Sequence, residues 1–235
     1  MKKLLTLCCV FCALLSMAQT TVYRKIGQRH DIHNGSTWQG TDSFRWAYTG
    51  ALLDMQNGLK GNASGNWNDL YRYTYTYNTN DLVASQILEN WNGTAWVNSK
   101  RYTYDYDANG NLTLVHYDLW SSSTWNQTGK IEYTGYNFQH KYAAETYYLW
   151  SGGGWVYFSK DVYQYYSNGY QIQNLERYDW NSTYNQWDSL ERWAYAYNVD
   201  SLASRIKLVP HAGNWWQSTK ETFSYSSTPF LLTLY

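Results

Sequence analysis

Residues 96–111 read WVNSKRYTYDYDANGN. This stretch opens on Trp96, continues through the alternating Tyr102, Tyr104 and Tyr106, and closes on Asp, Asn and Gly residues. Tyr, Trp and Thr favour extended strands, whereas Asn, Asp and Gly tolerate the positive φ angles that tight hairpin turns require. The stretch therefore predicts one long β-strand followed by a turn.

The same pattern recurs along the chain. We call the recurring tryptophans the repeat tryptophans: Trp38, Trp67, Trp96, Trp125, Trp155, Trp187 and Trp215, at intervals of 29, 29, 29, 30, 32 and 28 residues. Five residues after them stands a basic row of six, namely Arg72, Arg101, Lys130, Lys160, Arg192 and Lys220, with Ser43 as the exception. The position eight residues on is always aromatic, and ten residues on it is Tyr except at Gly135. A fixed period of this length indicates a repeat architecture.

After each turn a return strand follows, such as Leu112 to Trp120, and each copy is predicted to be a hairpin. Positions six, eight and ten after a repeat tryptophan share its parity. Because side chains alternate along a strand, we expect Trp and Tyr on one face and the basic row on the other. There the basic row would act as a solubilising stripe, which we favour, or as an anion-binding track. An aromatic face of this size rarely stays exposed on a monomer. Because neighbouring strands twist relative to one another, we expect the sheet to coil with this face on the inside.

These points predict an all-β fold of tandem antiparallel β-hairpin repeats. About 14 strands should form a coiled, one-sided sheet, a spiral or a partly closed barrel.

The N-terminus predicts a secretory signal peptide over residues 1–18. Lys2 and Lys3 precede an apolar run, and small residues stand before a cleavage site after Ala18. We therefore expect a secreted protein, extracellular or on the outer cell surface. Residues 19–33 are a lead-in, residues 34–225 a seven-copy repeat domain with a period of about 29 residues, and residues 226–235 a tail. Within the first copy, the segment 51–66 is rich in Gly and Asn, which allows a loop.

Composition excludes several classes of partner. Eighteen basic and eighteen acidic residues cancel, so nothing favours nucleic acid or an anionic membrane. No stretch after the signal peptide is apolar enough to span a membrane. Cys8, Cys9 and Cys12 all lie in the signal peptide, so the mature chain can form neither a disulfide nor a thiolate metal site. With 26 Tyr and 14 Trp, aromatic side chains must supply most of the core.

No catalytic, cofactor or metal residue is predicted, and we expect no enzyme. A nucleophile elbow is missing, and the carboxylates are too scattered to suggest a glycosidase pair. His30 and His33 flank Asp31, which would be half of a metal site lacking further ligands, or simply a solvated lead-in.

A second motif has two interpretations as well. Asp105, Asp107, Asn109 and Gly110 match the start of a calcium loop. The twelfth position is His116 rather than an acidic ligand, and the same residue types build a hairpin turn, which is the interpretation we favour.

Residues 102–112, YTYDYDANGNL, resemble the YD repeat of Rhs-type proteins, and residues 91–98, WNGTAWVN, extend the likeness. The combined repeat, over roughly residues 60–225, is similar to repeats in cargo of the type IX secretion system, whose molecular role is mostly unassigned. The resemblance implies a sheet that coils with its aromatic face inward. Such cargo usually carries a C-terminal sorting domain, which this sequence lacks. We therefore expect either a truncated chain or another export route.

Three functions are compatible with this pattern. The first is a non-enzymatic structural or adhesion module, and the second a carbohydrate-binding module acting on extracellular polysaccharide or cell-surface components. The third is a fragment of a larger Rhs-like shell or an enzyme with an unrecognised site. Candidate ligand-binding residues form cross-strand pairs over short turns: Trp91 and Trp96, Trp120 and Trp125, Trp150 and Trp155, and Trp180 and Trp187. Such a ladder would either form the rim of the core or stack against sugar rings.

Overall fold

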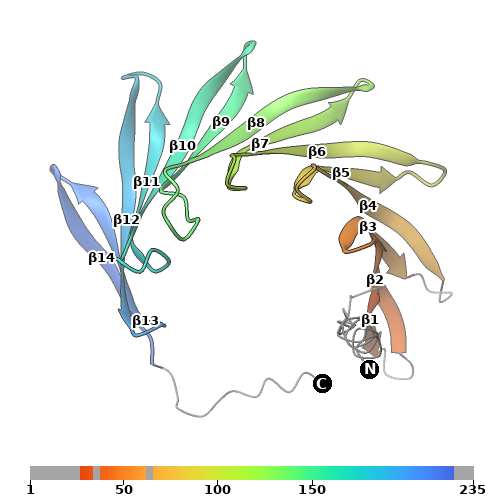
Figure 1. The fold of residues 1–235 in the computed structure, drawn as a ribbon, viewed down its shortest axis with the longest axis horizontal. Coiled ribbons are helices and arrows are strands. Elements are labelled where there is room, and N and C mark those ends of the chain that lie inside the picture. Colours follow the sequence, from red (N-terminus) through yellow and green to blue (C-terminus); the bar gives the residue numbers. More distant parts are fainter. Residues whose placement is uncertain (1–26, 34–37, 62–65, 225–235) are drawn as a thin grey trace, which may run out of the picture.

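A computed structural model describes residues 27–33, 38–61 and 66–224 of the chain. Fourteen antiparallel strands form one sheet in the order of the sequence, and the described residues contain no helix. The sheet coils into an open arc and does not close into a barrel (Figure 1). This confirms the predicted fold class. The predicted signal peptide and tail lie outside the described residues.

The strands are long and follow one another through short turns. Their bounds are β1 Gly27–His33, β2 Trp38–Thr49, β3 Leu52–Gly61, β4 Trp67–Tyr77, β5 Val83–Trp91, β6 Trp96–Tyr106, β7 Leu112–Ser121, β8 Thr124–Thr134, β9 Ala144–Ser151, β10 Gly154–Tyr165, β11 Ile172–Asn181, β12 Gln186–Asn198, β13 Ser201–His211 and β14 Asn214–Thr222. Turns after even-numbered strands gather on the inside of the arc, and the turns after the odd-numbered strands from β5 onward form its rim (Figure 1).

The natural unit is a hairpin made of an odd-numbered strand, a rim turn and the following even-numbered strand. Seven such hairpin units, from β1–β2 to β13–β14, make up the sheet. The first unit uses β1, which lies inside the segment expected to be a lead-in. The segment 51–66, which the sequence allowed as a loop, instead contains β3, because β2 and β4 pair with its backbone from both sides.

A β-bulge interrupts every even-numbered strand three residues after its repeat tryptophan. The residues skipped in the pairing register are Thr41, Leu70, Ser99, Thr128, Phe158, Leu190 and Ser218. An extra residue reverses the alternation of side chains beyond it. The expectation that Trp and Tyr share one face is therefore corrected. The repeat tryptophans from Trp67 to Trp215 share a face with the basic row, which we call the Trp face, and Tyr102, Tyr104 and Tyr106 lie on the opposite Tyr face.

Packing in this single sheet is thin. The buried hydrophobic side chains among the described residues are Leu59, Val115, Ile131 and Leu175, which are 5–7% exposed. Three of the four lie on the Tyr face, among half-buried phenol rings. Burial, reinforced by neighbouring tyrosines and Glu145, raises the pKa of Tyr104, Tyr117 and Tyr133 to about 12. Aromatic rings thus supply most of the packing, as the composition predicts.

In several hairpin units a tyrosine hydroxyl joins the two strands at the end that lies away from the rim turn. Tyr77 donates to the carbonyl of Leu53 over 2.8 Å, and Tyr106 donates to that of Val83 over 2.9 Å. In the same way the hydroxyl of Tyr165 donates to the carbonyl of Tyr142, and the hydroxyl of Tyr136 donates to the carbonyl of Leu112. Tyr136 takes this role because the tenth position of its copy is Gly135, which stands at φ +71° in a longer inner turn.

Candidate functional site

The rim of the Trp face carries the predicted tryptophan pairs. Each pair lies directly opposite across its rim turn, as expected: Trp91 and Trp96, Trp120 and Trp125, Trp150 and Trp155, and Trp180 and Trp187. Their ring centroids are 5.0–5.2 Å apart and strongly tilted, with interplanar angles of 60–72°. Seven of the eight rings are half-buried, while Trp150 is 37% exposed.

A cation from the preceding hairpin unit covers the second tryptophan of each pair. Distances from the cation to the ring centroid are 4.7 Å for Arg72 and Trp96, and 4.9 Å for Arg101 and Trp125. Lys130 and Lys160 lie 5.3 and 4.8 Å from the rings of Trp155 and Trp187, and Arg192 lies 4.8 Å from Trp215. These distances fit cation–π contacts. In the first unit the position of the basic row is occupied by Ser43. Arg29, which lies opposite Ser43 on β1, supplies the cation instead, 5.4 Å from the ring centroid of Trp67.

Four of these cations, Arg72, Arg101, Lys130 and Arg192, also form ion pairs within the sheet. Arg72 lies 2.5 Å from Glu89, and Arg101 lies 2.8 Å from Asp118. Asp118 is only 6% exposed, and Arg101 is the cation that compensates for its burial. The basic row therefore ties neighbouring units together, which corrects the interpretation of it as a solubilising stripe on the face opposite to Trp.

One part of the Trp face is more continuously aromatic than the sequence indicates. Tyr157 lies 4.8 Å from Trp180 and 5.2 Å from Trp187, and it also contacts Tyr148 at 4.9 Å. It is 42% exposed. We call Trp150, Trp155, Tyr157, Trp180 and Trp187 the aromatic cluster. Sequence reasoning missed Tyr157, although an aromatic residue two positions after a repeat tryptophan is unusual, since other copies place Asn98, Gln127 or Ser189 there.

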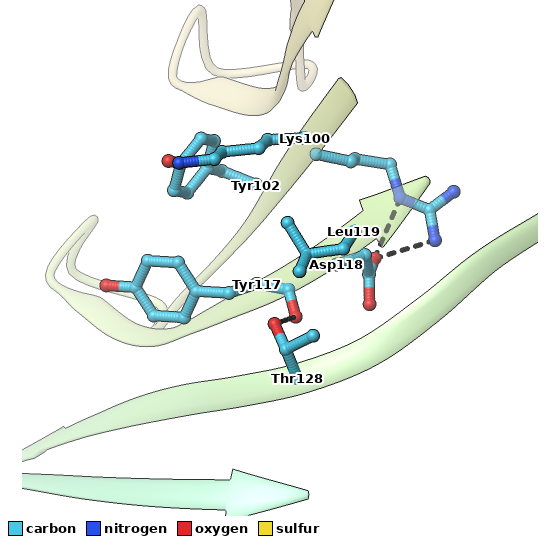
Figure 2. A pocket seen from close by; sticks show the side chains of 7 residues that line it. Lys100, Tyr102, Tyr117, Asp118, Leu119 and Thr128 are labelled. Atoms are coloured by element: carbon cyan, nitrogen blue, oxygen red, sulfur yellow. Dashed lines mark hydrogen bonds and ion pairs between the residues drawn. The ribbon is translucent and has the colours of Figure 1, made fainter. Parts of the chain in front are cut away.

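A small cavity lies between β6, β7 and β8 (Figure 2). It measures about 190 Å³ and is lined by Lys100, Arg101, Tyr102, Tyr117, Asp118, Leu119 and Thr128. Tyr102 and Tyr117 meet edge to face at 5.3 Å, and the hydroxyl of Thr128 donates to the carbonyl of Tyr117 over 2.9 Å. This volume is below the roughly 300–1,000 Å³ of small-molecule sites.

Carboxylates gather on the Tyr face in a way that sequence spacing does not reveal. Asp161 on β10 is directly opposite Glu145 on β9, and Arg177 on β11 lies 3.3 Å from Asp161 and 3.0 Å from Glu191. Glu145 accepts a hydrogen bond of 2.8 Å from the hydroxyl of Tyr163. Burial raises the pKa of Asp161 against the opposing effect of Arg177. Each of these carboxylates has a partner, which is the arrangement of a structural network.

The two metal candidates are occupied by other contacts where they are described. Asp107 caps an inner turn by accepting hydrogen bonds from the backbone of Asn109 and Asn111, and these bonds, led by that from the Asn111 side chain, lower its pKa. Asp107 therefore serves the hairpin turn, which is the interpretation that the sequence favoured over a calcium loop. The imidazole of His30 lies 2.5 Å from the carboxylate of Asp42, while the side chains of Asp31 and His33 lie outside the described residues. Among the side chains that are described, no three His, Cys, Asp or Glu residues are grouped to hold a metal.

The fold and the site together define an all-β protein built from one coiled sheet of hairpin units. No protein-family model matches the chain, and no curated protein matches it. In the described ranges no helix is long and apolar enough to cross a membrane.

Several solved structures are similar to parts of the fold. A porin-like protein from Bacteroides uniformis has 13% identity and a TM-score of 0.38, covering 83% of this chain and 92% of its own. A DUF3836 family protein from Bacteroides vulgatus has 21% identity and a TM-score of 0.28, covering 52% and 92%. TcdB2-TccC3 has 12% identity and a TM-score of 0.34, covering 79% of this chain and 14% of its own. At these values none of them assigns a function to this chain.

Proposed function

We propose that the protein is a non-enzymatic structural or adhesion module of the cell exterior, with the hairpin array as its scaffold. One observation carries this proposal: the row of charged side chains joins unit to unit. Five consecutive cations, from Arg72 to Arg192, each lie over the repeat tryptophan of the next unit. Contacts repeated at this period support an extended array rather than one reaction centre. The predicted signal peptide and the YD-like motif agree with export.

The proposal is tested on cells. A strain that produces the chain is compared with one lacking its gene for attachment to surfaces under shear and for envelope resistance to detergent. We expect both properties to fall without the gene and to return on complementation. Complementation with a scaffold variant, Arg101→Ala with Trp125→Ala, should restore less. A purified chain that turns over a substrate, and loses turnover through one conservative side-chain change, would overturn the proposal.

Carbohydrate binding is the second candidate, and the aromatic cluster is the observation that favours it. Tyr157 and Trp150 are the exposed members, whereas the second tryptophan of each pair is already covered by a cation. Flat rings in an exposed row suit stacking against sugars. Affinity gels containing single polysaccharides test this candidate: retardation of the wild type that Tyr157→Ala abolishes would support it, with Tyr102→Ala on the opposite face as the matched control.

A further inference from the structure

The sheet ends in two edge strands, and their directions match. Within the described residues β1 pairs only with β2, and β14 only with β13. Figure 1 places β1 and β14 at the two ends of the arc. Odd-numbered strands run from the inside of the arc to the rim, and even-numbered strands run back. Therefore β14 of one copy and β1 of another would be antiparallel, as every neighbouring pair in the sheet is.

One register rule holds at every junction between hairpin units. A single residue on the odd-numbered strand lies opposite two others: the fifth residue after the preceding repeat tryptophan, and the second residue after the following one. For example, Glu89 is opposite Arg72 on β4 and Asn98 on β6. The residues in this position at the six junctions are Leu59, Glu89, Asp118, Tyr148, Tyr178 and Leu208.

The rule assigns a register to a junction between copies. On β1, Asp31 is opposite Gly40, the second residue after Trp38. Its partner on a preceding strand is therefore the fifth residue after a repeat tryptophan, and on β14 that residue is Lys220. A basic residue then lies opposite an acidic one, as Arg72 lies opposite Glu89. In the same register Glu221 falls opposite His30 of the second copy.

Lys220 is also the one member of the basic row whose following unit is missing from the described sheet. The other five cations each lie over a ring of the next unit. Lys220 is exposed, and within the described residues it has neither an ion pair nor a ring contact. The first hairpin unit of a second copy would supply the missing neighbour.

We propose that copies of this chain join head to tail, β14 of one pairing with β1 of the next in the register Lys220 opposite Asp31. The array of seven units thereby continues from one molecule into another. This inference deepens the proposed structural role and takes its biological meaning from it. Strand addition at an exposed edge gives affinity through backbone hydrogen bonds, but one strand pair buries little surface, so assembly should depend on concentration.

Disulfide trapping tests the register on purified full chain. Cys8, Cys9 and Cys12 are replaced by serine, and two double variants are made: Glu221→Cys with His30→Cys, and Thr222→Cys with Arg29→Cys. Two adjacent pairs are needed because hydrogen-bonded and non-hydrogen-bonded pairs alternate, and the separation differs between them. The matched control, Glu221→Cys with Gln28→Cys, is two residues out of register on the same face.

We expect at least one in-register variant to give a ladder of covalent dimers, trimers and longer chains under oxidation, which the control lacks. Lys220→Glu should weaken association about fivefold, and adding Asp31→Lys should restore it. Monomers without cross-links would overturn the proposal. So would a cross-linked monomer, because it would show that the sheet closes on itself. A ladder combined with normal attachment in the gene-deletion strain would instead overturn the adhesion role and leave the assembly intact.

Discussion

The guanidinium of Arg101 on β6 lies 4.9 Å from the ring centroid of Trp125 on β8, and between them it pairs with Asp118 on β7 at 2.8 Å. One side chain thus joins three strands and two hairpin units. Because this contact recurs along the Trp face, its strength determines how firmly neighbouring units hold together.

A double-mutant cycle measures this contact. Arg101→Ala should cost about 1.5–3 kcal/mol, because it removes charged hydrogen bonds from a buried carboxylate. The coupling between Arg101→Ala and Trp125→Ala should be about 0.5–2 kcal/mol, measured by urea unfolding. The control cycle pairs Arg101 with Trp96, which lies on the same strand and is covered by Arg72 instead. Additive effects in both cycles would show that the cation does not link the units.

The tyrosine hydroxyls at the open ends of the hairpin units provide a second test. Tyr106→Phe removes only the oxygen that donates to Val83 over 2.9 Å. We expect a loss of about 0.5–1.5 kcal/mol in the free energy of unfolding. Tyr102→Phe on the same strand and face is the control, because its hydroxyl has no hydrogen bond in the described part of the chain. Equal losses of unfolding free energy in both variants would show that the hydrogen bond from Tyr106 to Val83 does not stabilise the hairpin unit.

Alkaline pH should destabilise the fold. The pKa of Tyr104, Tyr117 and Tyr133 is raised to about 12, whereas a phenol in the unfolded chain ionises near 10. Above pH about 10 the unfolded chain releases protons that the folded chain keeps, so stability present below that pH is lost between about pH 10 and 12. Urea midpoints should fall over this window, and tyrosinate absorbance should lag in the folded chain. Ionisation of all tyrosines near pH 10 without unfolding would contradict this.

Trp120 separates the structural role of the tryptophan pairs from a binding role. Trp120→Ala removes a half-buried ring 5.0 Å from Trp125 and should cost about 2–3 kcal/mol, somewhat less than a fully buried tryptophan. Thermal unfolding and polysaccharide retention are measured on the same sample. A lost retention with an unchanged unfolding midpoint would contradict the structural role and favour a sugar platform at this pair.

The sequence predicted the hairpins and the tryptophan pairs well, because both depend on local chemistry. Strand-forming aromatics, Asn and Gly turns and a constant period leave few alternatives, and four residues between Trp91 and Trp96 set them opposite each other. The division of side chains between the two faces could not be predicted in this way. It depends on the bulges, whose residues include Ser99, Phe158 and Leu190 and share no chemistry.

Other features arise from strands distant in sequence. Asp161, Arg177 and Glu191 come from three strands, and no spacing rule brings them together. A signal for the bulge does exist: in six of the seven copies a basic residue stands five positions after the repeat tryptophan, and in a regular strand these two side chains would point to opposite faces. Covariation of charge and aromatic ring between consecutive copies would have suggested a cation–π contact and therefore an extra residue in the strand.

An internal deletion tests whether the chain is an array of equivalent hairpin units that are stabilised by contacts between neighbours. Removing residues 92–120 joins Trp91 to the turn before Trp125, so that β5 can pair with β8 and Arg72 can reach Trp125. In such arrays stability grows with the number of units. The measurement is the thermal unfolding midpoint, followed by circular dichroism, of the shortened and the full chain. We expect a folded, cooperative protein with a lower midpoint. An unchanged midpoint, or a chain that no longer folds, would show that the units are not equivalent and do not stabilise one another.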